Sequence, residues 1–330
     1  MRLFLSISLI VILLTGCSTQ KKEAELLELS KPQWLKERPV STSYFYGIGI
    51  SPKVGGQVYY EEQAREKALA DISKQISTQI KSDQSYYRME DGTGVYEYIQ
   101  SRVRATSEEF LEGYELLDEW EDLNNRFAFY RLSKSEFYAR KAKRKEEALQ
   151  LGFQKYELAQ EAQQRNDIIT ALEQYAASID AVSGYMNEAT IIQTGHDSFD
   201  VYERAKEGLT YLLSCLQLSY SQSEVRVEHN SNLHEGTTVL RVSKFNQLIS
   251  GIPVRFRYSG GFLASDKYKS DDKGMITTPS LSFGNKPTES LKAELDLQTV
   301  GRQISRNLLV RQLIEKQKPA TATLLLKGIE

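Results

Sequence analysis

The first half of the chain changes from a strand pattern to a helix pattern. Tyr44 to Ile50 is rich in aromatic and β-branched residues and predicts a strand that ends before a pair of glycines. From Glu61 onward apolar residues recur every fourth position, which predicts an amphipathic helix. Glu61, Glu62 and Glu66 would suit the positive end of its dipole. The expected buried stripe of this helix consists of Ala64, Ala68, Leu69, Ile72, Ile76 and Ile80.

A second helix and two further strands are expected next. The pattern predicts a helix over 95–106 and strands over 110–120 and 126–132. The second strand alternates cleanly between two faces, whereas the buried face of the first is left open. Asn124 and Asn125 lie between these strands and tolerate positive φ, so we expect them to form a tight hairpin turn.

The middle of the chain has the periodicity of helices. A long helix is expected from Ser135 to Gln164, and Asp167 is a candidate N-cap for the next one. The two helices resemble a single tetratricopeptide-type unit, but an ordinary αα-hairpin explains them equally well, because such repeats normally stack in threes. A further helix is expected at about Phe199–Leu218. The helix that follows Asp167 would bury Ala171, Leu172, Tyr175 and Ile179.

After Ser221 the pattern changes to short alternating strands separated by turn residues, which predicts a β-sandwich. The expected fold class is therefore α+β and multidomain. A small α/β domain would cover 31–140, a helical region 141–220 and the sandwich 221–330. The expected strands lie within 223–229, 236–243, 251–259, 274–279, 291–298 and 321–328.

The N-terminus has the features of a secretory signal. Arg2 is followed by an apolar run from Leu3 to Leu14, which as a helix would rise about 18 Å and is too short to cross a hydrocarbon core. The run ends in Leu14-Thr15-Gly16-Cys17, which resembles the bacterial lipobox. This resemblance implies cleavage after residue 16 and acylation of Cys17 with palmitate-like chains. Residues 17–30 would then form a tether.

The resemblance to a lipoprotein also suggests where the protein resides. Ser18 follows the cysteine, and no aspartate stands there to imply retention at the inner membrane. We therefore expect an outer-membrane lipoprotein. Once Cys17 is acylated only Cys215 remains, so no internal disulfide is expected, and Cys215 is interpreted as a buried, inert thiol.

Several segments between Pro32 and Phe137 resemble the Lpp-twenty family of bacterial lipoproteins. They are Pro32-x-Trp34, "YFYGIGIS", "AREKALADISKQI", "SRVRATSEEFLEGYELLDEWED" and "FAFYRLSKSEF", in that order. The resemblance covers about residues 31–140 and implies a small domain with helices packed on a sheet. It implies no catalytic residues. A related module opens a flagellar assembly protein.

A second resemblance concerns the C-terminal region. The stretch "GIPVRFRYSGGFLASDKYKSDDKGMITTP", from Gly251 to Pro279, is similar to bacterial immunoglobulin-like and carboxypeptidase-regulatory-like modules. Such modules often contain Gly-x-Pro-Val, an alternating strand and a later Asp-x-x-Gly turn. The resemblance implies a β-sandwich domain.

The glycine-rich stretch after Tyr44 does not have the spacing of a phosphate-binding loop. Gly47 and Gly49 are followed by Ser51-Pro52, and the next glycine comes only at 55, so the Gly-x-Gly-x-x-Gly fingerprint is not met. Proline also removes an amide donor that a phosphate would use. We interpret these glycines as residues that allow a strand to pack closely.

Other candidate sites are interpreted as structural. His196, His229 and His234 are badly spaced for a closed zinc site. Ser270-x-x-Lys273 lacks the companion motifs of serine acyl-transferases. The acidic segment 266–274 lacks the glycine that an EF-hand needs at its sixth position, so we expect a turn there. No cofactor or metal is expected.

Three further clusters are expected to be ordinary surface or packing features. The carboxylates of Glu119 and Glu121 are assigned to a solvated strand, and the basic run 140–145 to a solvated helix face. A tyrosine cluster suggests either a binding surface or domain packing, with packing preferred. It comprises Tyr59, Tyr60, Tyr86, Tyr87, Tyr96 and Tyr98.

The functional hypothesis is a non-enzymatic interaction or scaffold lipoprotein of the cell envelope. Its expected partners are the bilayer and unidentified envelope proteins or glycan. The formal net charge of -2 gives no reason to expect nucleic acid. Two alternatives are an envelope polysaccharide or peptidoglycan hydrolase and an accessory subunit of flagellar or secretion machinery.

Overall fold

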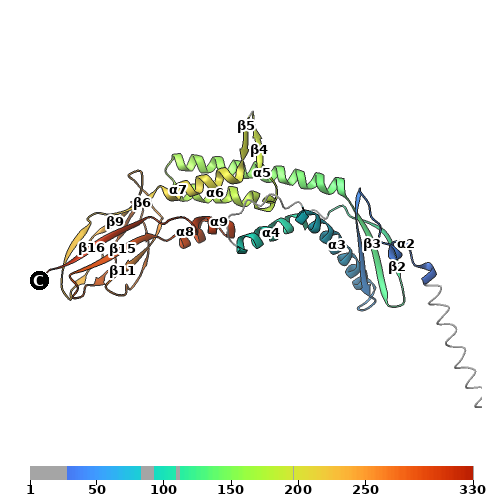
Figure 1. Ribbon diagram of the computed structural model, residues 1–330, viewed down its shortest axis with the longest axis horizontal. Helices are drawn as coiled ribbons and strands as arrows, with labels where there is room; N and C mark the ends of the chain where they lie inside the picture. Colours follow the sequence, from blue (N-terminus) through green and yellow to red (C-terminus); the bar gives the residue numbers. More distant parts are fainter. Residues whose placement is uncertain (1–27, 83–92, 109–111, 196, 330) are drawn as a thin grey trace, which may run out of the picture. The chain divides into compact units, whose positions relative to one another are not determined.

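The computed structural model describes residues 28–82, 93–108, 112–195 and 197–329 (Figure 1). Helices and sheets both contribute substantially, which confirms the expected mixed α and β class. The chain divides into two compact units. Unit 1 takes Met1–Gln84 and Ser107–Ala142, and unit 2 takes Ser85–Thr106 and Lys143–Glu330.

Unit 1 is a three-stranded antiparallel sheet with one long helix on one face (Figure 1). The strand order is β1-β3-β2, so β3 is central and pairs with both neighbours. On the opposite face Trp34 stacks on Phe129 with ring centroids 5.0 Å apart. The elements are α2 (Gln33–Lys36), β1 (Tyr44–Pro52), α3 (Gln57–Ser82), β2 (Glu115–Glu121), β3 (Asn125–Ser133) and the start of α5 (Lys134–Gln164).

Glycines let β1 lie directly against α3. A Cβ at Gly47 would stand 2.1 Å from the carbonyl oxygen of Ala68, and one at Gly49 would stand 1.8 Å from that of Ala64. The small residues of the helix face the glycines of the strand, so their backbones meet without intervening side chains. The sequence interpretation of close packing is confirmed. The core around this contact contains Phe45, Ala64, Ala68, Ile72, Ile76, Ala128, Tyr130, Leu132 and Phe137.

Side chains satisfy the outer edge of β1, which has no neighbouring strand. The amide of Ile48 donates to Asp71 Oδ2 at 3.1 Å, and the carbonyl of Ile50 accepts from Lys67 Nζ at 2.9 Å. The carbonyl of Tyr46, two residues before Ile48 on the same strand, accepts from Gln75 Nε2 at 2.6 Å. Because free edge groups are a template for further strand pairing, these bonds close the sheet on this side.

The bounds of α3 and β2 in unit 1 differ from the expectation. α3 begins at Gln57, so its first turn contains no acidic residue, and Glu61 and Glu62 lie in the second turn. β2 begins at Glu115 instead of residue 110, and residues 109–111 lie outside the described ranges.

The turn between β2 and β3 also differs, because neither Asn124 nor Asn125 has positive φ. The Asp122 carboxylate closes the turn by accepting the amides of Asn124 and Asn125 at 2.8 and 2.6 Å. This Asx-type turn uses local side-chain bonds in place of left-handed backbone.

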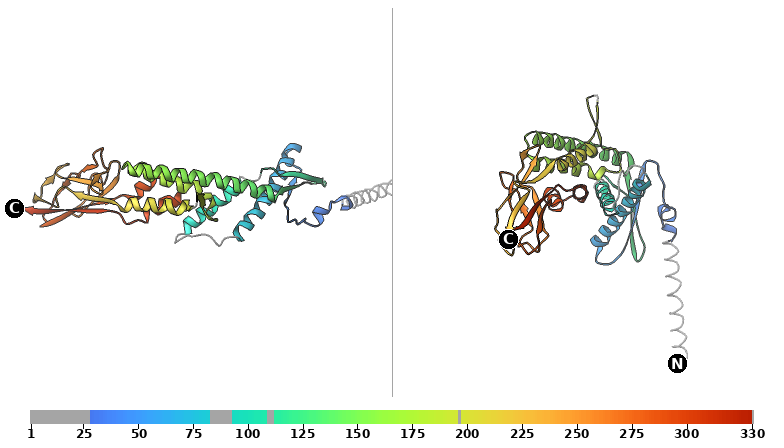
Figure 2. Two further views of the ribbon diagram at one scale, coloured as in Figure 1. Left: turned by 90° about the horizontal axis from the view of Figure 1, so that it is seen from above. Right: turned by 60° about the vertical axis from the view of Figure 1, so that its left-hand side comes forward.

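Unit 2 contains a layer of helices in which α5, α6 and α7 lie alongside one another (Figures 1 and 2). Asp167 caps α6 by accepting from the amide of Thr170 at 3.3 Å, as expected. Tyr175 is fully buried between helices, where Gly208 makes room for its ring. The elements are α4 (Thr93–Glu108), α6 (Ile168–Val182), η1 (Ser183–Tyr185), β4 (Ile191–Thr194), β5 (Asp197–Asp200) and α7 (Val201–Ser214).

The β4–β5 hairpin projects from these helices (Figures 1 and 2). Its base is fixed by Phe199, whose ring lies 5.0 Å from that of Phe153 and 4.8 Å from that of Tyr156. The 141–220 region, expected to be helical, therefore also contains strands.

The rest of unit 2 is built mainly of strands. One sheet has the order β12-β11-β15-β16-β7, and another contains β10, β9 and β13 with β6 on the other side of β9. All six expected strand segments contain a strand. The strands are β6 (Leu216–Tyr220), β7 (Glu224–Glu228), β8 (Asn232–Leu233), β9 (Val239–Lys244), β10 (Gln247–Leu248), β11 (Pro253–Tyr258), β12 (Lys267–Lys269), β13 (Met275–Thr277), β14 (Leu281–Ser282), β15 (Thr288–Leu295) and β16 (Thr321–Ile329).

Three local expectations for unit 2 are corrected. The helix expected at Phe199–Leu218 ends at Ser214, and the alternating residues after it form β6. Cys215 at this junction is half-buried instead of buried. Two short helices, α8 (Leu297–Ile304) and α9 (Leu308–Glu315), follow β15 and were not expected.

The glycine contact in unit 1 can be tested by Gly49→Ala. The new methyl group would overlap the Ala64 carbonyl, so we expect a loss of about 2 to 4 kcal/mol in the free energy of unfolding. Trp34 and Trp120 both lie in unit 1, so tryptophan fluorescence during urea unfolding reports on this unit. Ser51→Ala on the same strand face is the control and should cost less than about 1 kcal/mol. Equal effects of the two variants would contradict the packing argument.

Candidate functional site

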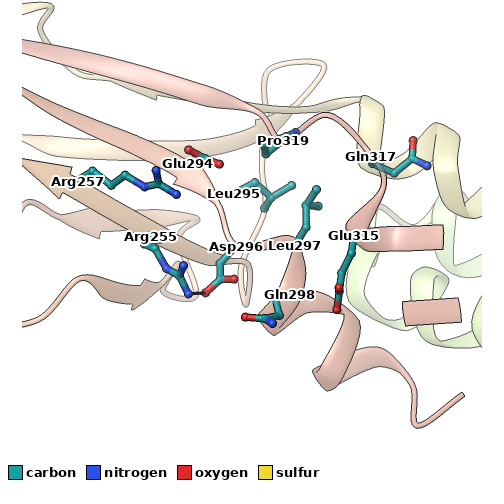
Figure 3. A pocket seen from close by; sticks show the side chains of 10 residues that line it. All are labelled: Arg255, Arg257, Glu294, Leu295, Asp296, Leu297, Gln298, Glu315, Gln317 and Pro319. Carbon is teal, nitrogen blue, oxygen red and sulfur yellow. Dashed lines mark hydrogen bonds and ion pairs between the residues drawn. The ribbon is translucent and has the colours of Figure 1, made fainter. Parts of the chain in front are cut away.

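A pocket of about 330 Å³ lies in unit 2, where β11 begins and β15 ends, near α8 and α9. Figure 3 shows Arg255 and Arg257 on one side of it and Glu315 and Gln317 on the other. Leu295, Leu297 and Pro319 lie between these two sides. The pocket therefore joins charged walls to an apolar middle.

Strand alternation places the arginines in the pocket. Val254 and Phe256 are buried in the sheet core, so Arg255 and Arg257 project from the opposite face of β11. Glu294 on β15 stands directly opposite Arg255 in the register and shares that face. Because side chains alternate between the two faces of each strand, β11 and β15 contribute both to the buried core and to the charged wall of the pocket.

Asp296 links the pocket to α8. It caps the helix by accepting from the amide of Thr299 at 3.1 Å and from its hydroxyl at 2.8 Å. Its Oδ2 also accepts from Arg255 Nη2 at 3.3 Å, and its side chain is only 4% exposed. One carboxylate thus fixes both the start of the helix and the position of the arginine.

The charged form of Asp296 is favoured in the folded protein. Burial by itself raises the pKa of this carboxyl, but the two bonds from Thr299 and the charges of Arg255 and Lys267 together lower it below the ordinary value. A carboxylate held in this state acts as a charge partner and a cap. It is poorly suited to donate a proton.

Two other charges of the pocket are available to a ligand. Within the described ranges neither Arg257 nor Glu315 forms an ion pair, and both are exposed. A guanidinium offers several donors in a planar fork, whereas a carboxylate accepts hydrogen bonds. The pocket is therefore suited to a polar group that carries both an anionic and a cationic part.

The lipidation site expected from the sequence, Cys17, lies outside the described residues. Every helix in the described ranges is too short or too polar to span a lipid bilayer. Comparisons with protein-family models, with curated proteins and with solved structures found no match for this chain.

The remaining sequence candidates have structural roles in the residues described. The Ser270 hydroxyl donates to the carbonyl of Ile249 at 2.8 Å and accepts the amide of Ile252 at 2.9 Å, so it holds two chain segments together. Asp271 accepts the amides of Lys273 and Met275 and forms the expected turn. No group of three or more metal-binding side chains is found among the described residues.

The described histidines and tyrosines of these candidate clusters are divided between the two units. His229 contacts the carbonyl of Gly284 at 3.3 Å, and His196 is outside the described ranges. Tyr59 and Tyr60 belong to unit 1, whereas Tyr98 belongs to unit 2. Tyr86 and Tyr87 lie outside the described residues, and the structure does not describe the side chain of Tyr96.

The charge clusters noted in the sequence form ion pairs. Arg126 on β3 pairs with Glu119 and with Glu121, whose Oε2 lies 3.3 Å from Nη1. In the basic run of α5, Lys145 Nζ lies 2.7 Å from Glu188 Oε2. These contacts support the interpretation of both clusters as parts of the protein surface.

Sequence reasoning did not find the pocket. Its local signals were Arg-x-Arg on an alternating strand and Glu-x-Asp at the end of another. Neither signal shows that the two strands are neighbours, and the register that brings Arg255 to Glu294 is known only from the structure.

The double role of Asp296 can be tested with two substitutions. Asp296→Asn keeps a capping oxygen and removes the charge, whereas Asp296→Ala removes both. We expect the alanine variant to lose about 1 kcal/mol more than the asparagine variant in the free energy of opening of residues 291–304, measured by amide hydrogen exchange. Equal losses would show that capping contributes nothing.

The acid dependence of the wild-type chain follows from the lowered pKa of Asp296. The folded state holds this proton less tightly than the unfolded state, so its contribution is complete above about pH 4 and is lost as the pH falls through the lower folded value. The stability difference between the wild type and Asp296→Asn should therefore narrow below about pH 4.

Proposed function

We propose that this protein is a lipid-anchored lipoprotein of the bacterial outer membrane that acts by binding other envelope components and not as an enzyme. The observation that supports this proposal most directly is the sequence Leu14-Thr15-Gly16-Cys17 at the end of a short apolar run. Acylation at this cysteine would hold the chain at a bilayer stably, because two or more chains bury many methylene groups.

The proposed modules are an Lpp-twenty-like domain over 31–140, a helical αα-hairpin region and an immunoglobulin-like β-sandwich over 221–330. The close packing of α3 on a three-stranded sheet supports the first. A short Asn166 turn between α5 and α6, with φ of 61°, supports a hairpin as the helical element. The contacts of β6 with β15 and β16 support two packed sheets at the C-terminal end.

The pocket beside Asp296 is the proposed contact point for an envelope partner. Arg257 and Glu315 supply opposite charges on its two walls, and Leu295 and Leu297 supply apolar contact. A protein segment with a charged side chain beside an apolar one would match this arrangement. Anchoring confines the protein to a surface and so raises its effective concentration toward such a partner.

The anchor is tested by Cys17→Ala. We expect this variant to lose labelled palmitate and to leave the membrane fraction. Cys215→Ala is the matched control, because it removes the other cysteine of the chain and should keep both properties. Unchanged labelling of Cys17→Ala would refute acylation at this position.

The contact point is tested by Arg257→Glu in the native envelope. Crosslinking followed by identification of the captured proteins should show at least about a tenfold loss of one partner, because a charge reversal at a desolvated contact costs well over 1.4 kcal/mol. Arg226→Glu is the control, since Arg226 lies on β7 at the far edge of the same sheet. Retention of all partners by Arg257→Glu would remove the pocket from the proposed function.

A further inference from the structure

One end of unit 1 carries four exposed apolar side chains. The exposed fractions of Val54, Val58, Tyr59 and Leu123 are 70%, 79%, 57% and 74%. We call these four residues the apolar tip. Isolated apolar residues on a surface are common, but a group of them at one end of a domain indicates a contact surface.

A hydrogen bond joins the two loops that form the apolar tip. The amide of Lys53, after β1, donates to the carbonyl of Asn124, after β2, at 2.8 Å. Tyr59 lies against Gly55, where a Cβ would stand 2.9 Å from its ring. Gly55 has φ of 85°, a backbone conformation that favours glycine. The tip is therefore a built feature of the β1–α3 loop and the β2–β3 hairpin.

The N-terminal part of the described chain lies at the same end of unit 1. Trp120 Nε1 donates to the Ser30 hydroxyl at 3.4 Å, and Trp120 precedes Leu123 in the hairpin by a reach of about 10 Å. Leu29 beside this contact is 74% exposed. The chain toward Cys17 thus departs from the neighbourhood of the apolar tip.

The length of chain between Cys17 and Glu28 limits how far this end can be from a bilayer. Even fully extended, these residues span no more than about 40 Å. A protein acylated at Cys17 would therefore keep Glu28 within about 40 Å of lipid. This restriction raises the effective concentration of lipid at the apolar tip and lowers the entropic cost of contact.

We infer that the apolar tip inserts into the interfacial region of the bilayer to which the chain is anchored, with phospholipid as its occupant. This inference rests on the proposed function, because the anchor supplies the bilayer. Valine and leucine would enter the acyl boundary, and the amphipathic ring of Tyr59 suits the headgroup level.

Charges around the apolar tip limit the depth of insertion. Lys53 Nζ lies 3.2 Å from Glu121 Oε1, so this pair can remain among the headgroups. Burial raises the pKa of Asp122, but the amides of Asn124 and Asn125 outweigh burial and lower it, so this carboxylate stays ionised. Insertion would therefore be limited to the side chains of the apolar tip.

The test uses the mature chain from residue 17 with Cys17→Ser, so that no acyl group contributes to binding. Its partition into vesicles of phosphatidylcholine, and of phosphatidylethanolamine with phosphatidylglycerol, is compared with that of Val54→Ser/Val58→Ser/Leu123→Ser. We expect binding to both lipid mixtures, and at least about a tenfold lower partition coefficient for the triple variant.

The matched control removes exposed apolar side chains that do not belong to the apolar tip. It is the triple variant Val40→Ser/Phe245→Ser/Phe262→Ser, whose wild-type side chains are highly exposed. We expect its partition coefficient to equal that of the parent chain. Circular dichroism and tryptophan emission in buffer should be the same for all three proteins, which separates loss of binding from loss of folding.

Each outcome decides the inference. Equal partition of the two triple variants, or no binding of the parent chain to either vesicle, would overturn it. Self-association that the tip variant abolishes, without vesicle binding, would assign the tip to a second copy of this chain. Failure of the proposed anchor is a separate result. Native protein without an acyl group would refute acylation at Cys17, but it would not change the vesicle measurement, which uses a chain without an acyl group.

Discussion

The structure of unit 1 depends on the contact between two backbones, that of β1 and that of α3. Gly47 and Gly49 place the strand against the carbonyls of Ala68 and Ala64, where any side chain would prevent the approach. Because the strand lies so close, polar side chains of the helix reach its outer edge and bind the edge groups of Tyr46, Ile48 and Ile50. One steric requirement therefore determines the core of the unit and closes its sheet.

In unit 2 the strand period has a comparable double effect. Alternate residues of β11 and β15 fill the core, and the residues between them form the charged wall of the pocket. Asp296 ends this pattern by starting a helix, and the same carboxylate holds Arg255. The residues that stabilise this end of the sheet therefore also form the walls of the pocket.

The sequence predicted elements whose signal is local. The strand at Tyr44, the buried positions Ala64, Ala68, Ile72 and Ile76 of α3 and the Asp167 cap each depend on neighbouring residues and were recognised. Leu69 of the expected stripe is only partly buried, and the side chain of Ile80 lies outside what the structure describes. α8 was missed because Leu297 extends the alternation of β15 by two residues, which conceals the start of the helix at Asp296. The pocket was missed for a different reason. Its charged wall combines Arg255 and Glu294, which are about forty positions apart in the sequence, and only the pairing of β11 with β15 brings them together. The apolar tip likewise needs the bond between Lys53 and Asn124.

The hydrogen-bonded outer edge of β1 would affect how copies of this chain meet at a membrane surface. Lipoproteins confined to a plane collide far more often than the same molecules in solution, and exposed strands would then join into ribbons. In unit 1 one border of the sheet is already satisfied by its own helix. The other border is β2, which carries the side chains of Glu115, Asp118, Glu119 and Glu121, and charged side chains on an edge strand disfavour the pairing of a further strand. If the chain is anchored as proposed, both borders of this sheet would disfavour edge-to-edge pairing between neighbouring copies.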